Sequence, residues 1–408
     1  MKNLTVIVIN DFGFINGGAE KVAIESAIEL KKRGLNVVFF CGTKPIADRL
    51  IELDIKIVCT NQEDILNGKN KFKLGIQGVW NTKAYNLLNK TLKDYDVNNT
   101  IIHIHSWQKT LSASVISCCI KNHFKMVMTL HSYCISCPNG GLYNYNKDKI
   151  CDIKPLSLKC IVKNCDSRHY FHKVWRVIRS FTQKYICKVP KNVSNYIYIS
   201  NYGRDILKEY LPKDSKFYNV KNPVDILKKD RVRSENNDVY LYIGRLSKEK
   251  GVLLLAEVAN TINRKIIFIG DGDCKDEIKK IYPEAEITGW LTKDQIERYL
   301  EISRALIFPS LWYEGMPLTV LESKSKGVPV ILSDKCNACE VIENKIEGLW
   351  FKRGDRLDLI NKINKLDNDN NLVQFLSRNC YKNYWHNDYG MSTHIEMLLQ
   401  CYKDIIEN

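Results

Sequence analysis

Two glutamates, Glu314 and Glu322, stand eight positions apart in the stretch EGMPLTVLE. The preceding stretch ALIFPS is typical of a buried strand, so Glu314 would lie in a loop beyond the strand's end. Pro317 suits the first turn of a helix, and Glu322 would lie in that helix, one turn after Leu318. Carboxylates can hold vicinal hydroxyls, and the first amides of a helix can bind phosphate. The pattern fits two sugar rings with a phosphate between them, as in a nucleotide-sugar, unless the glutamates only cover a solvated helix face.

A second group of polar residues follows the first strand of the second half of the chain, in IGRLSKEKG. Arg245 and Lys250 lie five positions apart across a turn that contains Ser247. A guanidinium fork can span two oxygens of a diphosphate, and an ammonium adds a point charge. The alternative interpretation is a basic surface loop.

A glycine pair, Gly17 and Gly18, leads into an expected helix after the first strand, in NGGAEK. Glycines allow the backbone to approach a ligand closely, and the amides that follow can face an anion. The pair is neither a G-x-G-x-x-G fingerprint nor a P-loop, and a plain helix-start turn is the alternative.

Five cysteines gather in residues 134–180, where no strand period is visible. A C-x2-C pair followed by further cysteines can form a structural zinc site. An iron–sulfur cluster and ordinary thiols are the alternatives. The candidate ligands are Cys134, Cys137, Cys151, Cys160 and Cys165.

Strand-like apolar runs alternate with helical patterns through both halves of the chain, which favours parallel sheets with helices on both faces. We therefore expect an α/β protein with two doubly wound domains. The expected strands are 6–9, 37–40, 101–104, 126–130 and 196–200 in the first half, and 239–244, 265–270, 305–310 and 328–332 in the second.

The polar stretch 211–237 marks the expected boundary between the domains. The prediction is a first domain over 1–215, with a Cys-rich insertion at about 134–170, and a second domain over 216–388. A C-terminal helix over 389–408 could pack back on the first domain.

The formal net charge of the 408 residues is +15, and the basic character belongs to the first half. Residues 101–200 hold 15 Lys and Arg against 3 Asp and Glu. Such a field suggests an anionic partner, either membrane lipid, a phosphorylated substrate or nucleic acid, although a solvated basic face is also possible. No apolar run reaches the length of a membrane span, so we expect a cytoplasmic protein with mostly reduced cysteines.

Aromatic residues alternate with Lys and Arg over 170–191, around a basic helix expected at 172–188. This pattern suits a peripheral position on an anionic membrane surface. The alternative is a helix of the first domain with a basic outer face. No nucleic-acid-binding motif accompanies the charge, so we do not expect a nucleic-acid partner.

Taken in order, these motifs resemble those of the retaining glycosyltransferases of family 4, which have the GT-B fold. The resemblance covers nearly the whole chain and is strongest over 239–353. The family's E-x7-E motif matches Glu314 and Glu322, and its G-R-L-x-x-x-K-G motif matches GRLSKEKG. NPVD at 222–225, IGDGD at 269–273 and ITGWL at 287–291 follow the family's order.

The resemblance implies two domains that face each other across a cleft, the first on the acceptor side and the second binding a nucleotide-sugar. Arg245 and Lys250 would bind the donor diphosphate, Glu322 the ribose, and Glu314 the transferred sugar. The catalytic histidine would be His105 rather than His103, with His131 as a second candidate. The other donor-binding residues would be Gly17, Gly18, Gly289, Trp290, Leu291, Gly315, Met316, Pro317, Leu318 and Thr319.

The same resemblance implies a transfer that keeps the anomeric configuration, by same-face attack without an enzyme nucleophile. The leaving diphosphate would be stabilised by Arg245, Lys250 and helix amides. No metal or cofactor would be needed for transfer, and the DYD and DGD pairs at 94–96 and 271–273 are interpreted as turns. One departure is CNACEVI at 336–342, where the family often has Gly-Gly before the Glu.

The expected function is transfer of a hexosyl group from a nucleotide-sugar, most often a UDP-sugar in this family, to a glycan or lipid-linked acceptor. Such enzymes build surface polysaccharides. The alternatives are a nucleotide-sugar epimerase and a non-catalytic protein that binds glycan or membrane. The former would need no acceptor surface.

Overall fold

The computed structural model describes residues 4–65, 67–224 and 226–407. The chain divides into two compact units, of which the first comprises Met1–Leu142, Asp152–Pro223 and Gly390–Asn408. The second comprises Tyr143–Cys151 and Val224–Tyr389. The first unit extends beyond the boundary expected at 215 because strand β9 (Lys216–Asn219) pairs in parallel with β8 (Asn195–Tyr198).

The first unit contains a seven-stranded sheet in the order β3-β2-β1-β4-β5-β8-β9, and its neighbouring strands are parallel. Five of the strands were expected, whereas β3 and β9, the four-residue, part-exposed strands at the two edges of the sheet, were not. The other strands are β1 (Thr5–Phe12), β2 (Asn36–Thr43), β3 (Lys56–Cys59), β4 (Thr100–Ile104) and β5 (Lys125–Thr129).

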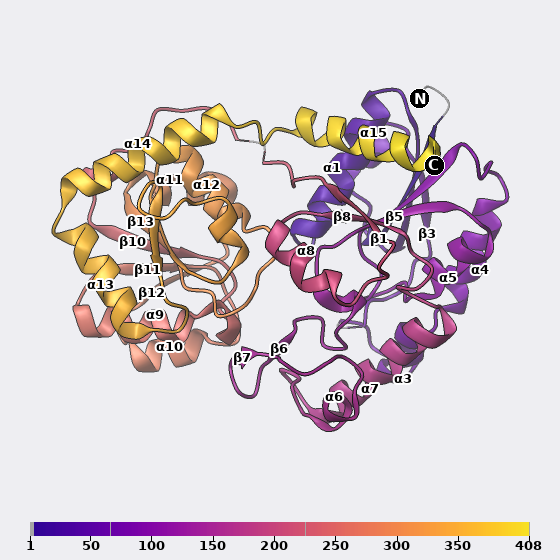
Figure 1. The fold of residues 1–408 in the computed structure, drawn as a ribbon, viewed down its shortest axis with the longest axis horizontal. Coiled ribbons are helices and arrows are strands. Elements are labelled where there is room, and N and C mark those ends of the chain that lie inside the picture. The colour runs from indigo at the N-terminus through magenta and orange to yellow at the C-terminus, as the bar shows by residue number, and fades with distance from the viewer. Residues whose placement is uncertain (1–3, 66, 225, 408) are drawn as a thin grey trace. The chain divides into compact units, whose positions relative to one another are not determined.

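Helices cover this sheet, and the C-terminal helix α15 (Met391–Glu407) is one of them (Figure 1). Its residues Ile395, Leu398 and Tyr402 are buried in the same core cluster as β1 and β2. The Tyr402 hydroxyl lies 2.6 Å from Nδ1 of His103 on β4. The other helices are α1 (Gly18–Lys32), α2 (Asp48–Glu52), α3 (Lys71–Val79), α4 (Thr82–Leu92), α5 (Ser114–Lys121) and α8 (Asn201–Lys208).

The Cys-rich insertion does not stay within the first unit. Its hairpin, β6 (Tyr143–Asn144) with β7 (Lys149–Ile150), belongs to the second unit. Burial raises the pKa of Asp148 in this hairpin, and the charges of Lys248 and Glu249 also act on it. The rest of the insertion forms the short α6 (Leu158–Val162) and the helix α7 (Tyr170–Phe181), which continues as a π-helical turn to Ile186.

The second unit contains a six-stranded parallel sheet in the order β12-β11-β10-β13-β14-β15. The strands are β10 (Val239–Ile243), β11 (Ile266–Ile269), β12 (Glu286–Gly289), β13 (Ser303–Phe308), β14 (Val330–Ser333) and β15 (Gly348–Phe351). The helices are α9 (Val252–Ile262), α10 (Lys275–Ile281), α11 (Lys293–Glu301), α12 (Leu318–Lys326), α13 (Arg356–Asp367) and α14 (Asn370–His386).

Alternate residues of β10 enter two different cores, as expected for a central strand buried on both faces. Tyr240 and Tyr242 pack with the cluster that contains residues of α9, α10 and α13. Leu241 and Ile243 pack with the cluster that contains residues of α11, α12 and α14. The expected doubly wound α/β architecture is confirmed in each unit.

In both sheets the strand order reverses beside the first strand of the sheet. In the first unit β1 lies between β2 and β4, and in the second β10 lies between β11 and β13. Ligands of open α/β sheets bind beyond the C-terminal ends of strands at such switch points. The loops after β10 and β13 are therefore neighbours, and so are the loops after β1 and β4. In the described part of the chain, no helix combines the length and the apolar composition that crossing a bilayer requires.

Candidate functional site

Glu314 is buried in the loop between β13 and α12, where hydrogen bonds from three other residues fix its position. Its Oε2 accepts a hydrogen bond from Lys250 Nζ at 2.6 Å, and its Oε1 accepts one from Ser310 Oγ at 2.6 Å. Its backbone oxygen accepts from Asn337 Nδ2 at 2.9 Å. The backbone φ angle of Glu314 is 66°, a left-handed conformation that is uncommon for residues other than glycine and that is often found at functional sites. The carboxylate is thus fixed in place beside a cation.

Arg245 is tethered in the loop after β10. Its Nη2 donates to Glu249 Oε1 at 2.5 Å, and its Nε donates to Ser247 Oγ at 3.2 Å. The Arg245 side chain is 57% exposed, whereas that of Glu249 is 4% exposed. A buried carboxylate thus orients the guanidinium, and an exposed edge of it stays open to an anion.

Close backbone packing brings the two loops together. Gly251, after the short helix η4 (Lys248–Lys250), has φ 73°, and a Cβ there would lie 2.0 Å from the carbonyl oxygen of Pro309. Leu311 N donates to the backbone oxygen of Glu249 at 2.9 Å. Only glycine allows this approach, and the approach puts Lys250 within reach of Glu314.

Helix α12 begins after Pro317, its N-cap, and ends at Gly327, whose φ is 77°. The end at Gly327 agrees with the sequence prediction, whereas Pro317, expected in the first turn, is the extended N-cap residue before Leu318. The first amides of α12, from Leu318 and Thr319, have no carbonyl partner within the helix and can bind an anion. Glu322 is half-buried in the next turn of the same helix. Gly315 and Met316 lie in the loop that leads to α12.

The segment predicted to lie beside a base follows β12, at one edge of the same sheet. Gly289 has φ 74°, and Trp290 is 68% exposed. Leu291 is partly buried against the core cluster that also contains Leu321 of α12. An exposed indole beside a glycine turn can stack on a flat ring.

In the first unit, Gly17 is the exposed N-cap residue of α1, and Gly18 is the first residue of that helix. His105 follows β4, the neighbouring strand, and is buried. Its Nδ1 lies 3.0 Å from His131 Nε2. Within the described residues, its Nε2 is buried without a hydrogen-bond partner.

Burial lowers the pKa of all three neighbouring histidines. The pKa of His103 falls to about 3, that of His131 to about 4, and that of His105 well below its usual value. These imidazoles are therefore neutral at pH 7. His103 lies inside the sheet, since its Nε2 is 2.7 Å from Thr129 Oγ1 and its other nitrogen faces Tyr402. His105 and His131 are the members of the row that lie beyond the strand ends.

The structure does not gather the five candidate metal ligands. The ammonium of the buried Lys173 lies 3.5 Å from Cys160 Sγ and 3.4 Å from Cys165 Sγ. Cys151 belongs to the second unit. Among the described residues, no group of three or more His, Cys, Asp or Glu side chains is arranged to hold a metal ion.

Sequence reasoning missed the residues that position the site. Ser310, Asn337 and Glu249 hold Glu314 and Arg245 by hydrogen bonds. Asn337 lies in the stretch CNACEVI that departs from the family pattern, and its backbone N also donates to Tyr313 at 3.0 Å. Ser310, a polar residue at the end of the strand expected over 305–310, is the signal that the sequence offered.

Comparisons with known proteins agree with this architecture. The model of Glycosyltransferase Family 4 matches residues 16–227, more than half of the chain. The model of Glycosyl transferases group 1 matches residues 224–383.

Among the curated relatives that match part of the chain are two bacterial glycosyltransferases. One is the UDP-Gal:alpha-D-GlcNAc-diphosphoundecaprenol alpha-1,3-galactosyltransferase of Escherichia coli, 28% identical over 47% of this chain and 52% of that protein. Another is the N,N'-diacetylbacillosaminyl-diphospho-undecaprenol alpha-1,3-N-acetylgalactosaminyltransferase of Campylobacter jejuni, 28% identical over 43% and 46%. The chain spans about half the length of the curated relatives it matches.

Among solved structures, Anabaena Alr3699/HepE in complex with UDP-glucose is similar with a TM-score of 0.66. The sequences are 15% identical, and the match covers 98% of this chain and 100% of that one. This likeness concerns the fold, which is the GT-B arrangement of two parallel-sheet units. From the match over residues 16–227, the chain belongs to glycosyltransferase family 4.

Proposed function

We propose that the chain transfers a hexosyl group, with retention of configuration, from a nucleotide-sugar to a glycan or lipid-linked acceptor. The observation that carries this proposal is the pairing of Lys250 with the buried Glu314 at the switch point of the second unit. Beside it, Arg245 is held by Glu249. The arrangement combines cations for a diphosphate with a carboxylate for sugar hydroxyls.

Each residue has a role that follows from its chemistry. Arg245 and Lys250 bind the diphosphate and stabilise the charge that develops on it as the glycosidic bond breaks. Glu314 accepts hydrogen bonds from hydroxyls of the transferred sugar, and Glu322 accepts them from the ribose. The amides at the start of α12 take the phosphate oxygens, so that transfer requires no metal.

His105 contributes as a neutral hydrogen-bonding group. Its pKa is lowered well below the usual value, chiefly by burial, so it is not an acid at pH 7. The Nε2 atom of His105 has no hydrogen-bond partner among the described residues, and we assign it the contact with the sugar. Gly17 and Gly18 present the first amides of α1 to the phosphates.

The acceptor and the nucleotide are proposals drawn from relatives. Both curated relatives are named for acceptors in which a sugar is joined to undecaprenol through a diphosphate. The similar Anabaena structure holds UDP-glucose. We therefore propose a UDP-sugar donor and an acceptor of this lipid-linked kind, used in the assembly of a surface polysaccharide.

The test of this function is Glu314→Ala in a transfer assay with lipid-linked acceptor. The expected result is a loss of turnover of about 100-fold or more, because a contact to the reacting sugar is removed, with nucleotide binding retained. Lys362→Ala on α13 serves as a surface control. Full turnover by Glu314→Ala would sink the assignment.

We also propose that the first unit docks on the inner face of an anionic membrane. One side of α7 is apolar and exposed, at Phe171, Val174 and Ile178. Phe72 on α3 and Leu158 on α6, helices that contact α7, are 81% and 82% exposed. Apolar side chains next to a basic face suit insertion at the boundary of headgroups and acyl chains.

Flotation with vesicles that contain phosphatidylglycerol tests the docking. The double substitution Phe171→Ser with Ile178→Ser should release the chain from these vesicles, because it removes apolar area that enters the bilayer. Leu357→Ser on α13, also an exposed apolar position, should leave binding intact. Equal flotation of the two variants would contradict the proposal.

Structural zinc on the Cys-rich segment stays a prediction. A metal bound by Cys160 and Cys165 would have to displace the Lys173 ammonium that lies beside both sulfurs. Metal analysis of the purified chain, without chelator, would test it.

A further inference from the structure

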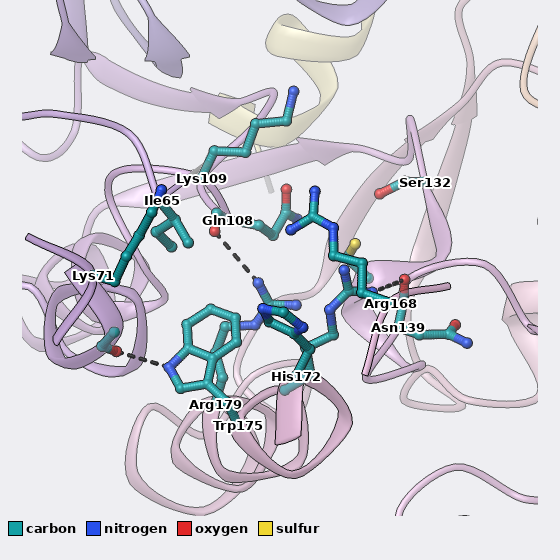
Figure 2. Close-up of a pocket in the computed structure, with 13 residues that line it drawn as sticks. Ile65, Lys71, Gln108, Lys109, Ser132, Asn139, Arg168, His172, Trp175 and Arg179 are labelled. Carbon is teal, nitrogen blue, oxygen red and sulfur yellow. Dashed lines mark hydrogen bonds between the residues drawn. The ribbon is translucent and has the colours of Figure 1, made fainter. Parts of the chain in front are cut away.

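A pocket of about 550 Å³ opens in the first unit, apart from the residues assigned above (Figure 2). Helix α7 forms one wall through His172, Trp175, Arg176 and Arg179. Helix α3, the loop after β4 and the loop after β5 form the others. Its volume is within the range of roughly 300–1,000 Å³ that is typical of small-molecule sites.

The lining of this pocket is strongly basic. Five cationic side chains line the pocket, and its described lining contains no Asp or Glu. The cations are Lys71, Lys109, Arg168, Arg176 and Arg179. They come from three segments that are distant in the sequence, near residues 71, 109 and 168–179, so the charge is assembled by the fold.

Two of the arginines are held in place, Arg179 by backbone oxygens that leave its charge unneutralised and Arg176 partly by a carboxylate. Arg179 donates to the backbone oxygens of Gln108 at 3.4 Å and Pro138 at 3.3 Å. Burial leaves the charge of Arg179 poorly hydrated, and this loss of hydration lowers the pKa of its guanidinium. Arg176 Nη1 donates to the backbone oxygen of Asn139 at 3.1 Å. Its Nε lies 3.2 Å from Oδ2 of the buried Asp166.

Nearby carboxylates do not cancel this field. Asp166 is the one carboxylate in ion-pair contact with a lining arginine in the described structure. Asp11, whose charge also acts on Arg179, accepts hydrogen bonds from the backbone of Lys109, Thr110 and Leu111. Asp11 therefore fixes the loop that carries Lys109, and the pocket keeps an excess of positive charge.

Aromatic packing makes the wall rigid. Trp175 Nε1 donates to the backbone oxygen of Gly75 at 2.8 Å, which ties α7 to α3. The Arg179 guanidinium lies 5.1 Å from the centre of the Trp175 ring. Planar guanidinium groups with spare N–H donors are suited to phosphate oxygens.

The same helix carries the apolar surface. The side chains at 172, 176 and 179 line the pocket, whereas those at 171, 174 and 178 are exposed and apolar. A molecule with a charged phosphate group and a lipid tail could use both sides of α7, because the charged group would enter the pocket while the tail stayed in the bilayer.

We propose that this basic pocket binds the diphosphate of the lipid-linked acceptor. The inference rests on the proposed function, and it assigns to α7 the task of holding the acceptor's charged linker. Arg176 and Arg179 grip the phosphate oxygens from the helix, and Arg168 and Lys109 add positive charge to the same lining.

The test uses farnesyl diphosphate, a short prenyl diphosphate, and isothermal titration. The measurements are made in the Arg245→Ala, Lys250→Ala background, so that the predicted nucleotide site cannot account for the binding. Adding Arg168→Ala and Lys109→Ala should weaken binding by about tenfold or more, since two charge-assisted contacts are lost. Arg49→Ala, an exposed arginine of the same unit, should leave the affinity unchanged.

The outcomes separate the possible sources of the phosphate. Undiminished binding by the pocket variant, or no binding by its parent background, would overturn the proposal. If the pocket variant instead lost phosphatidylglycerol vesicles without losing farnesyl diphosphate, the pocket would serve a lipid headgroup and the acceptor assignment would be wrong. A thermal shift of the Arg168→Ala, Lys109→Ala variant by nucleotide reports the proposed function separately.

Discussion

At the scale of residues, the site depends on charges that are held before any ligand arrives. The Glu314 carboxylate is paired with Lys250 and hydrogen-bonded to Ser310, so its position is fixed. A group that is already oriented costs little reorganisation when the transition state forms. This explains why turnover, more than binding, should respond to Glu314.

The buried histidines give the first unit a pH-dependent stability. Their pKa values are lowered, to about 3 for His103 and about 4 for His131, whereas an unfolded histidine titrates near 6.5. The unfolded chain therefore binds more protons as the pH falls below 6.5, and stability present above that pH is lost. At pH 5 each such histidine should cost about 2 kcal/mol.

The variant His103→Gln tests this directly. The free energy of unfolding of the first unit should fall less between pH 7 and pH 5 in this variant than in the wild type, by about 2 kcal/mol. Urea unfolding with pulsed hydrogen exchange at β4 measures it. His169→Gln, at an exposed histidine, should keep the wild-type slope. An unchanged slope for His103→Gln would refute the explanation.

The residues themselves were only partly readable in the sequence. The E-x7-E and G-R-L-x-x-x-K-G motifs marked Glu314, Glu322, Arg245 and Lys250. The ion pair between Lys250 and Glu314 joins positions 64 residues apart, and no spacing rule predicts it. The roles of these residues and of His105 stay predictions until they are measured.

At the scale of elements, the contact of the loop after β10 with the end of β13 decides whether the site exists. Gly251→Ala should abolish nucleotide binding, because its Cβ would meet the Pro309 oxygen at 2.0 Å and push the two loops apart. Gly34→Ala is a matched control, with φ 83° and nothing within 4 Å of the added Cβ.

Both substitutions place a Cβ on a left-handed backbone, which costs about 1–2 kcal/mol of stability. Only Gly251→Ala also creates a steric clash. Melting temperatures with and without nucleotide separate the two effects. If Gly251→Ala bound nucleotide as well as Gly34→Ala does, the close approach would not be what builds the site.

The elements show where sequence patterns are sufficient. Long apolar runs predicted the central strands, and Gly327 marked the end of α12. The short β9 and the β6–β7 hairpin were not predicted, because their residues form no long apolar run. The basic helix was expected at 172–188, yet the pocket beside it depends on loops that only the fold brings together.

At the scale of the whole molecule, the positive charge is concentrated in one part of the sequence. Residues 101–200, which hold the basic excess, contribute α7 and most of the basic pocket. In the second unit the two cations of the candidate site are paired with carboxylates, Arg245 with Glu249 and Lys250 with Glu314. The strand alternation predicted two doubly wound units, but it could not show that Tyr143–Cys151 belongs to the second.

A thermal-shift screen with UDP, GDP, ADP and their sugars, without added metal, tests whether the second unit holds a nucleotide-sugar donor. A donor that binds the folded chain at a hundred times its dissociation constant should add about 2.7 kcal/mol of stability. We expect a shift with one nucleotide, most simply UDP, that Arg245→Ala loses and Lys362→Ala keeps. No shift with any nucleotide, or a shift that Arg245→Ala retains in full, would contradict a donor site at the switch point of the second unit.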